Sequence, residues 1–298
     1  MSKKTVTLLL AVLLTFALTL ALAQDAAVTV TDMYGREITL AQPATRVVAL
    51  TASDCEILCA IGCEEALVGR GTYCDYPESI LAVPEVASGY ETNVEQIIAL
   101  EPQVVLMSDM SQTPEQVEAL EAAGIAVVVS DANDIEGTYT AIRMIGQLMA
   151  KEEQAEALIG DMRQTFEDIA AKCEDSGKTV YFEVSPLEWG LWTAGKSTFM
   201  DELAAICGLT NAFADVEGWA SISEEQVLER DPDYIVTITM YYGEGPTPVE
   251  EIMGRAGWEE LKAVQNESIF NADSNAVSRP GPRLKDAAVK LYNFVYGE

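Results

Sequence analysis

The chain has 298 residues, with 18 lysines and arginines against 48 aspartates and glutamates, a formal net charge of -30, and no histidine. Such acidity argues against binding to nucleic acid or to anionic lipid, because both need clustered Lys and Arg. The absence of histidine removes the Ser-His and Cys-His nucleophile pairs and the commonest zinc ligand, which argues against a hydrolase.

Residues 1–23 are predicted to be a signal peptide. Lys3 and Lys4 precede an apolar run over 6–22, and residues 21–23 (Ala-Leu-Ala) have the small-x-small pattern of a signal peptidase site. Removal of the two lysines would change the net charge from -30 to -32. The run is almost long enough to span a bilayer, so an uncleaved anchor is the alternative. Gln24 stands where a lipoprotein carries its cysteine, so no lipid attachment is expected.

Residues 24–132 are predicted to form a first α/β lobe. Short apolar runs typical of buried strands alternate with amphipathic helical stretches that end at a glycine. Strands are expected at 47–50, 104–107 and 126–129, and helices at 53–61 and 114–123. Apolar strands that alternate with helices indicate a mostly parallel sheet covered on both faces.

This lobe carries four of the six cysteines, namely Cys55, Cys59, Cys63 and Cys74. The first three recur every four residues, which places them on one stripe of a helix. We interpret them as small buried residues on a core-facing helix, and a bridge to Cys74 is left open. Their spacing matches no common iron–sulfur pattern, but a metal or redox site built from the four cysteines is the alternative from another functional class.

Residues 133–175 are predicted to form a single connecting helix. Asn133 or Asp134 is suited to cap its start, and the Asp-Ser-Gly sequence at 175–177 to end it. Apolar residues recur between them at helical spacing: Ile142, Ile145, Met149, Leu158, Ile159, Met162 and Phe166. Such a helix exceeds the average length, so it is expected to act as a rigid connector between two lobes.

Residues 176–298 are predicted to form a second α/β lobe on the same plan. Strands are expected at 179–184, 235–238 and 269–272, and a helix at 198–206. An internal repeat supports this plan, because 93–106 aligns without gaps on 223–236 and sets Glu95 opposite Glu225. Ligands of such sheets bind beyond the carboxyl ends of the strands, so the sequence predicts a ligand cleft between the lobes.

Residues 190–197 (GLWTAGKS) match the phosphate-loop pattern G-x-x-x-x-G-K-[ST]. A phosphate loop follows its strand directly and uses small residues, so that backbone N–H groups reach the phosphates. Here residues 186–189 separate the predicted strand from the first glycine, and Trp192 occupies the loop itself. We therefore reject nucleotide hydrolysis and expect the tryptophans of this stretch to form an apolar contact surface for a ligand.

Aromatic residues gather at the ends of predicted strands: Tyr73, Tyr76, Tyr90, Trp189, Trp192, Trp219, Tyr241 and Tyr242. Each could be an ordinary packing residue, but as a set they favour a large, flat, partly apolar ligand. Arg279 lies on a proline-rich turn before the last predicted helix. It is expected either to meet an anionic edge of the ligand or to form a salt bridge.

Five stretches carry a family resemblance through their order and spacing: RVVALTASDCEILCAIG, NVEQIIALEPQVVL, TAGKSTFMDELAAICGLTN, GWASISEEQVLERDPDYIV and SRPGPRL. With them the chain resembles the iron-siderophore, heme and cobalamin-binding proteins of ABC importers, the class with a long helical hinge. It is most similar to the cobalamin-binding branch. The resemblance implies two Rossmann-like α/β lobes joined by a single long α-helix, and a monomeric binding protein without catalytic residues or a resident cofactor.

The resemblance also implies roles for individual residues. One glutamate per lobe of this family docks into the permease dimer of the importer, and the matching positions are Glu95 and Glu225. Ligand contacts are expected at Tyr73, Tyr90, Trp192, Trp219 and Arg279. Ser108 departs from the branch, which has an aromatic residue there. The expected ligand is a cobalamin-like corrinoid, with a ferric siderophore or heme as alternatives, captured on the periplasmic or extracellular face of the membrane.

Overall fold

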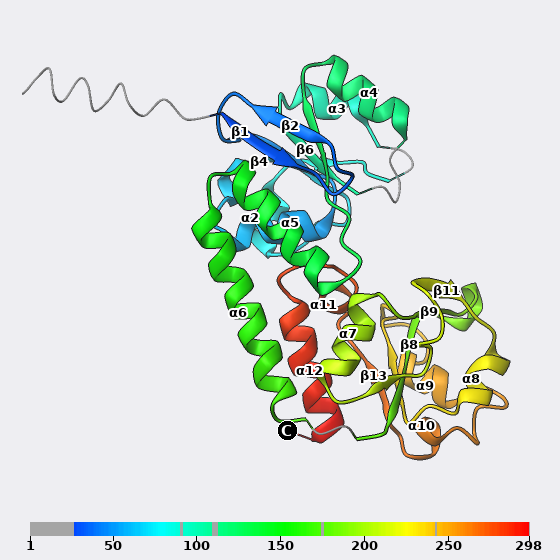
Figure 1. Ribbon diagram of the computed structural model, residues 1–298. Coiled ribbons are helices and arrows are strands. Elements are labelled where there is room, and N and C mark those ends of the chain that lie inside the picture. Colours follow the sequence, from blue (N-terminus) through cyan, green and yellow to red (C-terminus); the bar gives the residue numbers. More distant parts are fainter. Residues whose placement is uncertain (1–26, 90–91, 109–112, 174–175, 242, 298) are drawn as a thin grey trace, which may run out of the picture.

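The computed structural model describes residues 27–89, 92–108, 113–173, 176–241 and 243–297. The predicted signal segment and Tyr90 lie outside these ranges. Within them, no helix combines the length and the apolar character that crossing a membrane requires. The chain forms two α/β lobes, one above the other in Figure 1, with helices α6 and α12 side by side beneath the upper lobe.

The N-terminal lobe contains a five-stranded sheet in the order β5-β4-β3-β6-β7, in which all neighbouring strands are parallel. Its strands are β3 (Val47–Ala49), β4 (Leu67–Gly71), β5 (Glu85–Val86), β6 (Val104–Met107) and β7 (Ala126–Val129). An antiparallel hairpin of β1 (Val28–Thr31) and β2 (Glu37–Leu40) precedes it. Residues of β3 and β6 are buried on both faces, as the apolar runs predicted.

The helices of this lobe begin where a polar side chain caps the first turn. Thr51, Asn93 and Thr113 accept hydrogen bonds from backbone N–H groups of the first turn of α2, α3 and α4. The helical segments are α2 (Ala52–Ala60), η1 (Glu64–Ala66), η2 (Glu78–Ala82), α3 (Val94–Ala99) and α4 (Pro114–Ala122). These bounds agree with the predicted helices at 53–61 and 114–123 to within one residue at each end.

The C-terminal lobe contains a sheet in the order β11-β9-β8-β12-β13, in which β8, β12 and β13 are parallel and β9 runs antiparallel to both of its neighbours. β10 shares one edge of β8 with β9. The strands are β8 (Thr179–Ser185), β9 (Trp192–Ala194), β10 (Thr210–Asn211), β11 (Trp219–Ser221), β12 (Tyr234–Thr237) and β13 (Ile269–Asn271). Two α/β lobes with mostly parallel sheets were predicted, and this prediction is confirmed.

Seven helical segments belong to the C-terminal lobe among the described residues: η3 (Leu187–Trp189), α7 (Phe199–Ile206), α8 (Glu224–Arg230), α9 (Pro248–Met253), α10 (Lys262–Gln265), α11 (Ser274–Val277) and α12 (Leu284–Tyr296). Thr198 and Ser223 cap α7 and α8 in the same way as the caps of the first lobe. The last helix, α12, returns along α6 and ends near it (Figure 1).

The internal repeat occupies the same place in both lobes. In each copy a short helix leads into the strand beside the first strand of the large sheet, α3 into β6 next to β3 and α8 into β12 next to β8. The equivalence extends to the backbone, because Glu101 and Asp231, 130 positions apart, both have a positive φ, 48° and 43°. Each precedes a proline, which cannot continue a helix and therefore ends the helix at the same point.

The prediction of one helix over 133–175 is wrong, because this segment forms two helices, α5 (Ile135–Leu148) and α6 (Glu152–Ala170). Ala150 adopts a left-handed φ of 51°, and the N–H of Lys151 donates back to the carbonyl of Gly146 at 2.7 Å. This is the hydrogen bond that closes a helix at its C-terminus. A Cβ on Gly146 would lie 2.6 Å from the Cβ of Ala155, so the glycine allows the two helices to pack closely.

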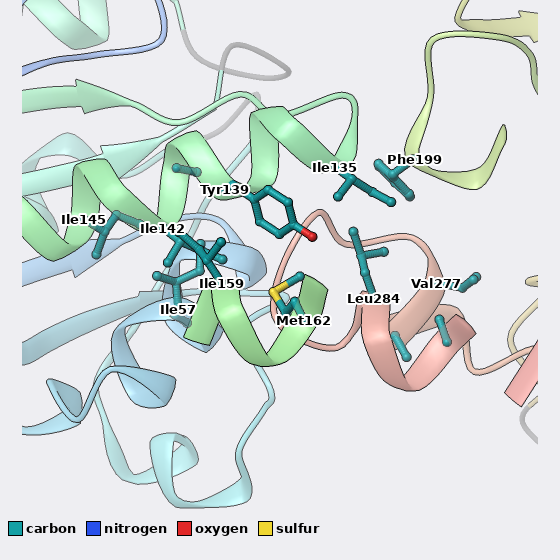
Figure 2. Close-up of a cluster of buried hydrophobic side chains, with 14 of the residues drawn as sticks. Ile57, Ile135, Tyr139, Ile142, Ile145, Ile159, Met162, Phe199, Val277 and Leu284 are labelled. Carbon is teal, nitrogen blue, oxygen red and sulfur yellow. The ribbon is translucent and has the colours of Figure 1, made fainter. Parts of the chain in front are cut away.

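One apolar core runs from the N-terminal lobe through α5 and α6 into the C-terminal lobe. Figure 2 shows Ile57 of α2 and Ile142 of α5 near Ile159 and Met162 of α6, with Leu284 of α12 on the far side. Separate clusters cover the outer face of each sheet. Side chains alternate along the strands, so that one face of each sheet joins the shared core.

Candidate functional site

A cleft of about 770 Å³ lies between the two lobes. On the N-terminal side it is lined by residues one or two positions after the strands: Thr51 after β3, Tyr73 after β4, Ser88 after β5, Ser108 after β6 and Ser130 after β7. Because all five strands are parallel, their carboxyl ends meet at one edge of the sheet. The cleft therefore occupies the place where sheets of this kind bind ligands.

The C-terminal lobe closes the other side of the cleft with apolar groups. Phe199 and Met200 begin α7, Trp219 begins β11, and Ile238 follows β12. The rings of Phe199 and Trp219 pack at 5.3 Å between centroids with a tilt of 58°, which gives the indole a fixed support. One wall is thus rich in hydroxyl groups and the opposite wall is aromatic and apolar. That combination suits a large ligand with both hydrogen-bonding and apolar surfaces.

The structure brings together three of the five residues predicted to contact a ligand. Tyr73, Trp219 and Arg279 all line the cleft, and the Tyr73 side chain is well exposed at 73%. Trp192 does not line it, although the pairing of β9 with β11 sets Ser221 opposite Trp192 and thereby places both indoles on the same face of the sheet. Tyr90 lies outside the described residues.

Arg279 reaches the cleft, but its guanidinium is already engaged. One nitrogen, Nη1, donates to Glu56 at 3.1 Å and to Asp75 at 2.6 Å, while Nη2 donates to the Tyr73 carbonyl at 3.0 Å and to the Asn275 side chain at 2.9 Å. Of the two expectations for this residue, the structure supports the salt bridge. Burial raises the pKa of Asp75, but the hydrogen bond and charge of Arg279 outweigh it and hold that pKa below its usual range.

Asp54 lies fully buried in the first turn of α2, next to cleft residues of the N-terminal lobe. Burial raises its pKa to about 6, although hydrogen bonds with Thr51 and Ser130 oppose the rise and the nearby charge of Asp131 adds to it. Its Oδ1 atom has no hydrogen-bond partner among the described residues. Sequence reasoning missed this group and the hydroxyls beside it. Their only signal in the sequence was a place within a few residues of a strand end, where residues of these types are too common to be picked out.

The cysteines are not gathered into a group with metal-ligand spacing among the described residues. All six are free thiols, and no group of three or more potential ligands is close enough to hold a metal within the described ranges. The expected helical stripe is also incomplete, because α2 ends before Gly62, whose φ is 77°, and Cys63 therefore lies beyond the helix. Burial raises the pKa of the Cys59 thiol to about 12, which lowers the share of the reactive thiolate at neutral pH.

The phosphate-loop pattern adopts another structure. Residues 192–194 of the motif form strand β9, paired antiparallel to β8, and Lys196 pairs with Glu217 at 3.0 Å. A Cβ on Gly195 would lie 2.2 Å from the Val216 carbonyl, so this glycine serves close backbone packing. The motif therefore does not form a phosphate cradle, as its tryptophan and its distance from the strand predicted.

Glu95 and Glu225 are exposed and sit in the first turns of α3 and α8. Among the described residues, neither carboxylate forms an ion pair within 4 Å. Each helix runs back from the carboxyl edge of its sheet to the amino end of the next strand, so its N-terminus lies at the edge that faces the cleft. The two glutamates thus occupy equivalent positions on the cleft side of the two lobes.

Several known bacterial binding proteins are similar to this chain. An uncharacterised ABC transporter substrate-binding lipoprotein of Bacillus subtilis is 34% identical over 276 residues, which cover 90% of this chain and 85% of that protein. The crystal structure of a periplasmic vitamin B12-binding protein of Vibrio cholerae matches with a TM-score of 0.69 at 25% identity, over 85% of this chain and 97% of that one. A heme-binding protein of the same organism matches with a TM-score of 0.76 at 23% identity, over 85% and 99%, which supports the fold alone.

The match to a known family spans both lobes and the helices between them. Residues 47–276 match the family described as periplasmic binding protein, which includes every strand of the two large sheets and almost all of the residues around the cleft. The chain belongs to the periplasmic binding protein family.

Proposed function

We propose that the protein is the exported substrate-binding protein of an ABC importer and captures a cobalamin-like corrinoid or a similar bulky metal chelate. The observation that carries the proposal is the cleft of about 770 Å³, with an aromatic wall facing a wall of hydroxyl groups. The apolar wall suits the faces of a macrocycle, and the hydroxyls suit amide groups around its rim. The metal ion belongs to the cargo, so the protein needs no resident cofactor.

The partner follows from the two glutamates on the cleft side of the lobes. Glu95 and Glu225 are exposed carboxylates at equivalent positions of two lobes that share one core. Two such groups can engage two symmetry-related basic pockets of a permease dimer at once, which fixes orientation as well as affinity. We propose that these residues dock the loaded protein onto the importer.

Two observations support export: residues 1–23 resemble a signal peptide, and the relatives are a substrate-binding lipoprotein and a periplasmic binding protein. The Bacillus subtilis relative is described as a lipoprotein, whereas Gln24 stands here where a lipid-bearing cysteine is expected. We therefore propose a chain released from its signal segment on the outer side of the cytoplasmic membrane. Mass spectrometry of the exported protein tests this, since an N-terminus at Gln24 is expected.

Ligand binding is tested with a panel of purified chelates: cyanocobalamin, an uncharged ferric trihydroxamate and heme. Trp219 lines the cleft, so binding is expected to change tryptophan fluorescence, and isothermal titration gives the affinity. Cyanocobalamin is expected to bind with a stoichiometry of one and with the highest affinity of the three. Binding of heme alone would contradict the corrinoid assignment, and binding of none would contradict the proposed function.

A further inference from the structure

Arg279, the cation at the cleft, belongs to a network of ion pairs that joins the two lobes. Arg279 and Arg283 come from the turn between α11 and α12, whereas Glu56 belongs to α2 of the N-terminal lobe. Arg283 binds the two oxygens of Glu56 at 2.9 and 2.6 Å, and Arg279 binds one of the same oxygens at 3.1 Å. The Glu56 side chain is only 2% exposed, so its charge is held by these two guanidinium groups.

A second carboxylate completes the network. Asp75 accepts from Arg279 through Oδ1 at 2.6 Å and from the amide of Asn275 through Oδ2 at 3.0 Å. Asn275 in turn accepts from Arg279 at 2.9 Å. Two arginines therefore face two carboxylates, and the cluster as a whole carries no net charge. The four N–H donors on Nη1 and Nη2 of Arg279 are therefore already used, which leaves only the Nε–H for an anionic ligand.

The rest of the lining adds no other positive charge. Arg279 is the only cationic side chain among the described residues that line the cleft, while Asp131 contributes a negative charge and Asp54 lies buried beside it. The remaining polar side chains are uncharged: the amide of Asn133, the phenol of Tyr73, and the hydroxyls of Thr51, Ser53, Ser88, Ser108, Ser130 and Ser278. Hydroxyls can both donate to and accept from amide groups, but they do not offset the charge of a carboxylate or catecholate.

We propose that Glu56 and Asp75 determine the charge selectivity of the cleft, because they neutralise Arg279 and thereby exclude anionic chelates in favour of uncharged or cationic ones. This inference rests on the proposed function and deepens it, since it narrows the class of metal chelate by charge. A ligand carboxylate near Arg279 would meet Asp75, which already pairs with that guanidinium at 2.6 Å. An amide group in the same place would gain hydrogen bonds from the hydroxyl wall at no electrostatic cost.

The test compares two pairs of chelates that differ mainly in charge. The first pair is cyanocobalamin and its monocarboxylic acid, obtained by hydrolysis of one peripheral amide. The second pair is an uncharged ferric trihydroxamate and a trianionic ferric tris-catecholate. The readout is the ratio of the two dissociation constants within a pair. For the wild type we expect a preference for the uncharged member of about tenfold or more at low salt, and a smaller preference at high salt.

Asp75→Asn is the main variant, because Asp75 is partly exposed and Glu56 keeps its bond to Arg283 without it. It should free part of the Arg279 charge and lower the preference by about threefold to tenfold. Glu56→Gln should act in the same direction if the buried change allows folding. The matched control is Asp215→Asn, which removes one exposed carboxylate from a bidentate pair with Arg230, at 2.7 and 3.0 Å, away from the cleft.

The outcomes separate the two proposals. A preference that falls in Asp75→Asn and not in Asp215→Asn supports the selectivity role. If the wild type and Asp75→Asn show the same preference for the uncharged member of a pair, this inference is overturned and the proposed function stands. A wild type that prefers the anionic member of a pair would overturn it as well. Failure to bind any of the four chelates would overturn the proposed function, and this inference with it.

Discussion

At the scale of single residues, the aromatic wall of the cleft depends on the packing of Phe199 against Trp219. The indole of Trp219 is 37% exposed and rests against Phe199, whose ring is buried at the start of α7. A side chain fixed in this way loses little conformational freedom when a ligand stacks on it. Trp189 is also exposed, at 78%, but does not line the cleft. Comparing variants of the two tryptophans therefore distinguishes the loss of a cleft contact from the loss of an exposed indole elsewhere.

We predict that Trp219→Ala weakens the binding of cyanocobalamin by about 1–3 kcal/mol, the range for loss of a well-packed aromatic contact. Trp189→Ala should leave the affinity unchanged. Isothermal titration of both variants measures the difference, and thermal unfolding checks that Trp219→Ala remains folded. Equal affinities in the two variants would mean that the ligand does not use this wall.

At the scale of secondary structure, the two copies of the repeat present the same helix to the same side of the molecule. Glu95 and Glu225 lie in first turns, where a carboxylate is stabilised by the helix dipole by typically 0.3–1 kcal/mol. Helix stabilisation accounts for each glutamate alone. It does not account for their equivalent positions on two lobes that share one core. Common descent of the two repeats is one reason for these positions, and docking is the functional one.

We predict that Glu95→Ala combined with Glu225→Ala leaves the affinity for cyanocobalamin unchanged but impairs its uptake into vesicles that contain the cognate permease. Each single variant should lose part of the uptake, and added salt should weaken docking of the wild type. The matched control is Glu115→Ala with Glu153→Ala, because both of these glutamates are also exposed in the first turn of a helix. Normal uptake by the first double variant at limiting protein concentration would exclude the docking role.

At the scale of the whole molecule, the shared core makes the two lobes one folding unit. Ile57 of the N-terminal lobe is fully buried and belongs to the same apolar cluster as Phe182 and Leu284 of the C-terminal lobe. The ion-pair network at Glu56 adds a second connection beside the helices. Two lobes joined in this way should move little relative to each other and should unfold together.

We predict that Ile57→Ala lowers the free energy of unfolding by about 2–5 kcal/mol, as expected for a cavity in a buried core. All four tryptophans lie after residue 176, so their fluorescence reports on the C-terminal lobe, while far-UV circular dichroism reports on both lobes. Both signals should shift to lower urea concentration together. An unchanged fluorescence midpoint would show that the lobes unfold separately. Ile98→Ala, at a position 38% exposed, should change stability by less than about 0.5 kcal/mol.

Apolar periodicity and caps act locally, and with them the sequence predicted strands and helices to within one residue at each end: β3, β6, β7, β8, β12, β13, α2, α4 and α7. The break between α5 and α6 was missed for a local reason too. Its left-handed residue is Ala150, where a glycine would have marked the end of the helix. The apolar spacing continues across the break because both helices bury a face against the same core.

The candidate site was predicted only in part. Tyr73 and Trp219 belong to the aromatic residues at the ends of predicted strands, and the family resemblance singled them out as ligand contacts. The serines around them carry no such signal in the sequence, since serine is common in loops. They converge only because the sheet order β5-β4-β3-β6-β7 brings the ends of five strands to one edge. Tyr73, Trp219 and Arg279 line the cleft, and their contact with a ligand stays a prediction.

The sequence by itself determined two α/β lobes of similar plan, the absence of histidine chemistry, and the repeated pair Glu95 and Glu225. All of these follow from composition, periodicity and self-similarity, which are properties of the chain alone. Only the tertiary structure decided what Arg279 does. Its partner Glu56 lies 223 positions earlier, and the bond forms because the turn before α12 packs against α2. Charge pairing over such a separation depends on how the lobes meet, and no local pattern records it.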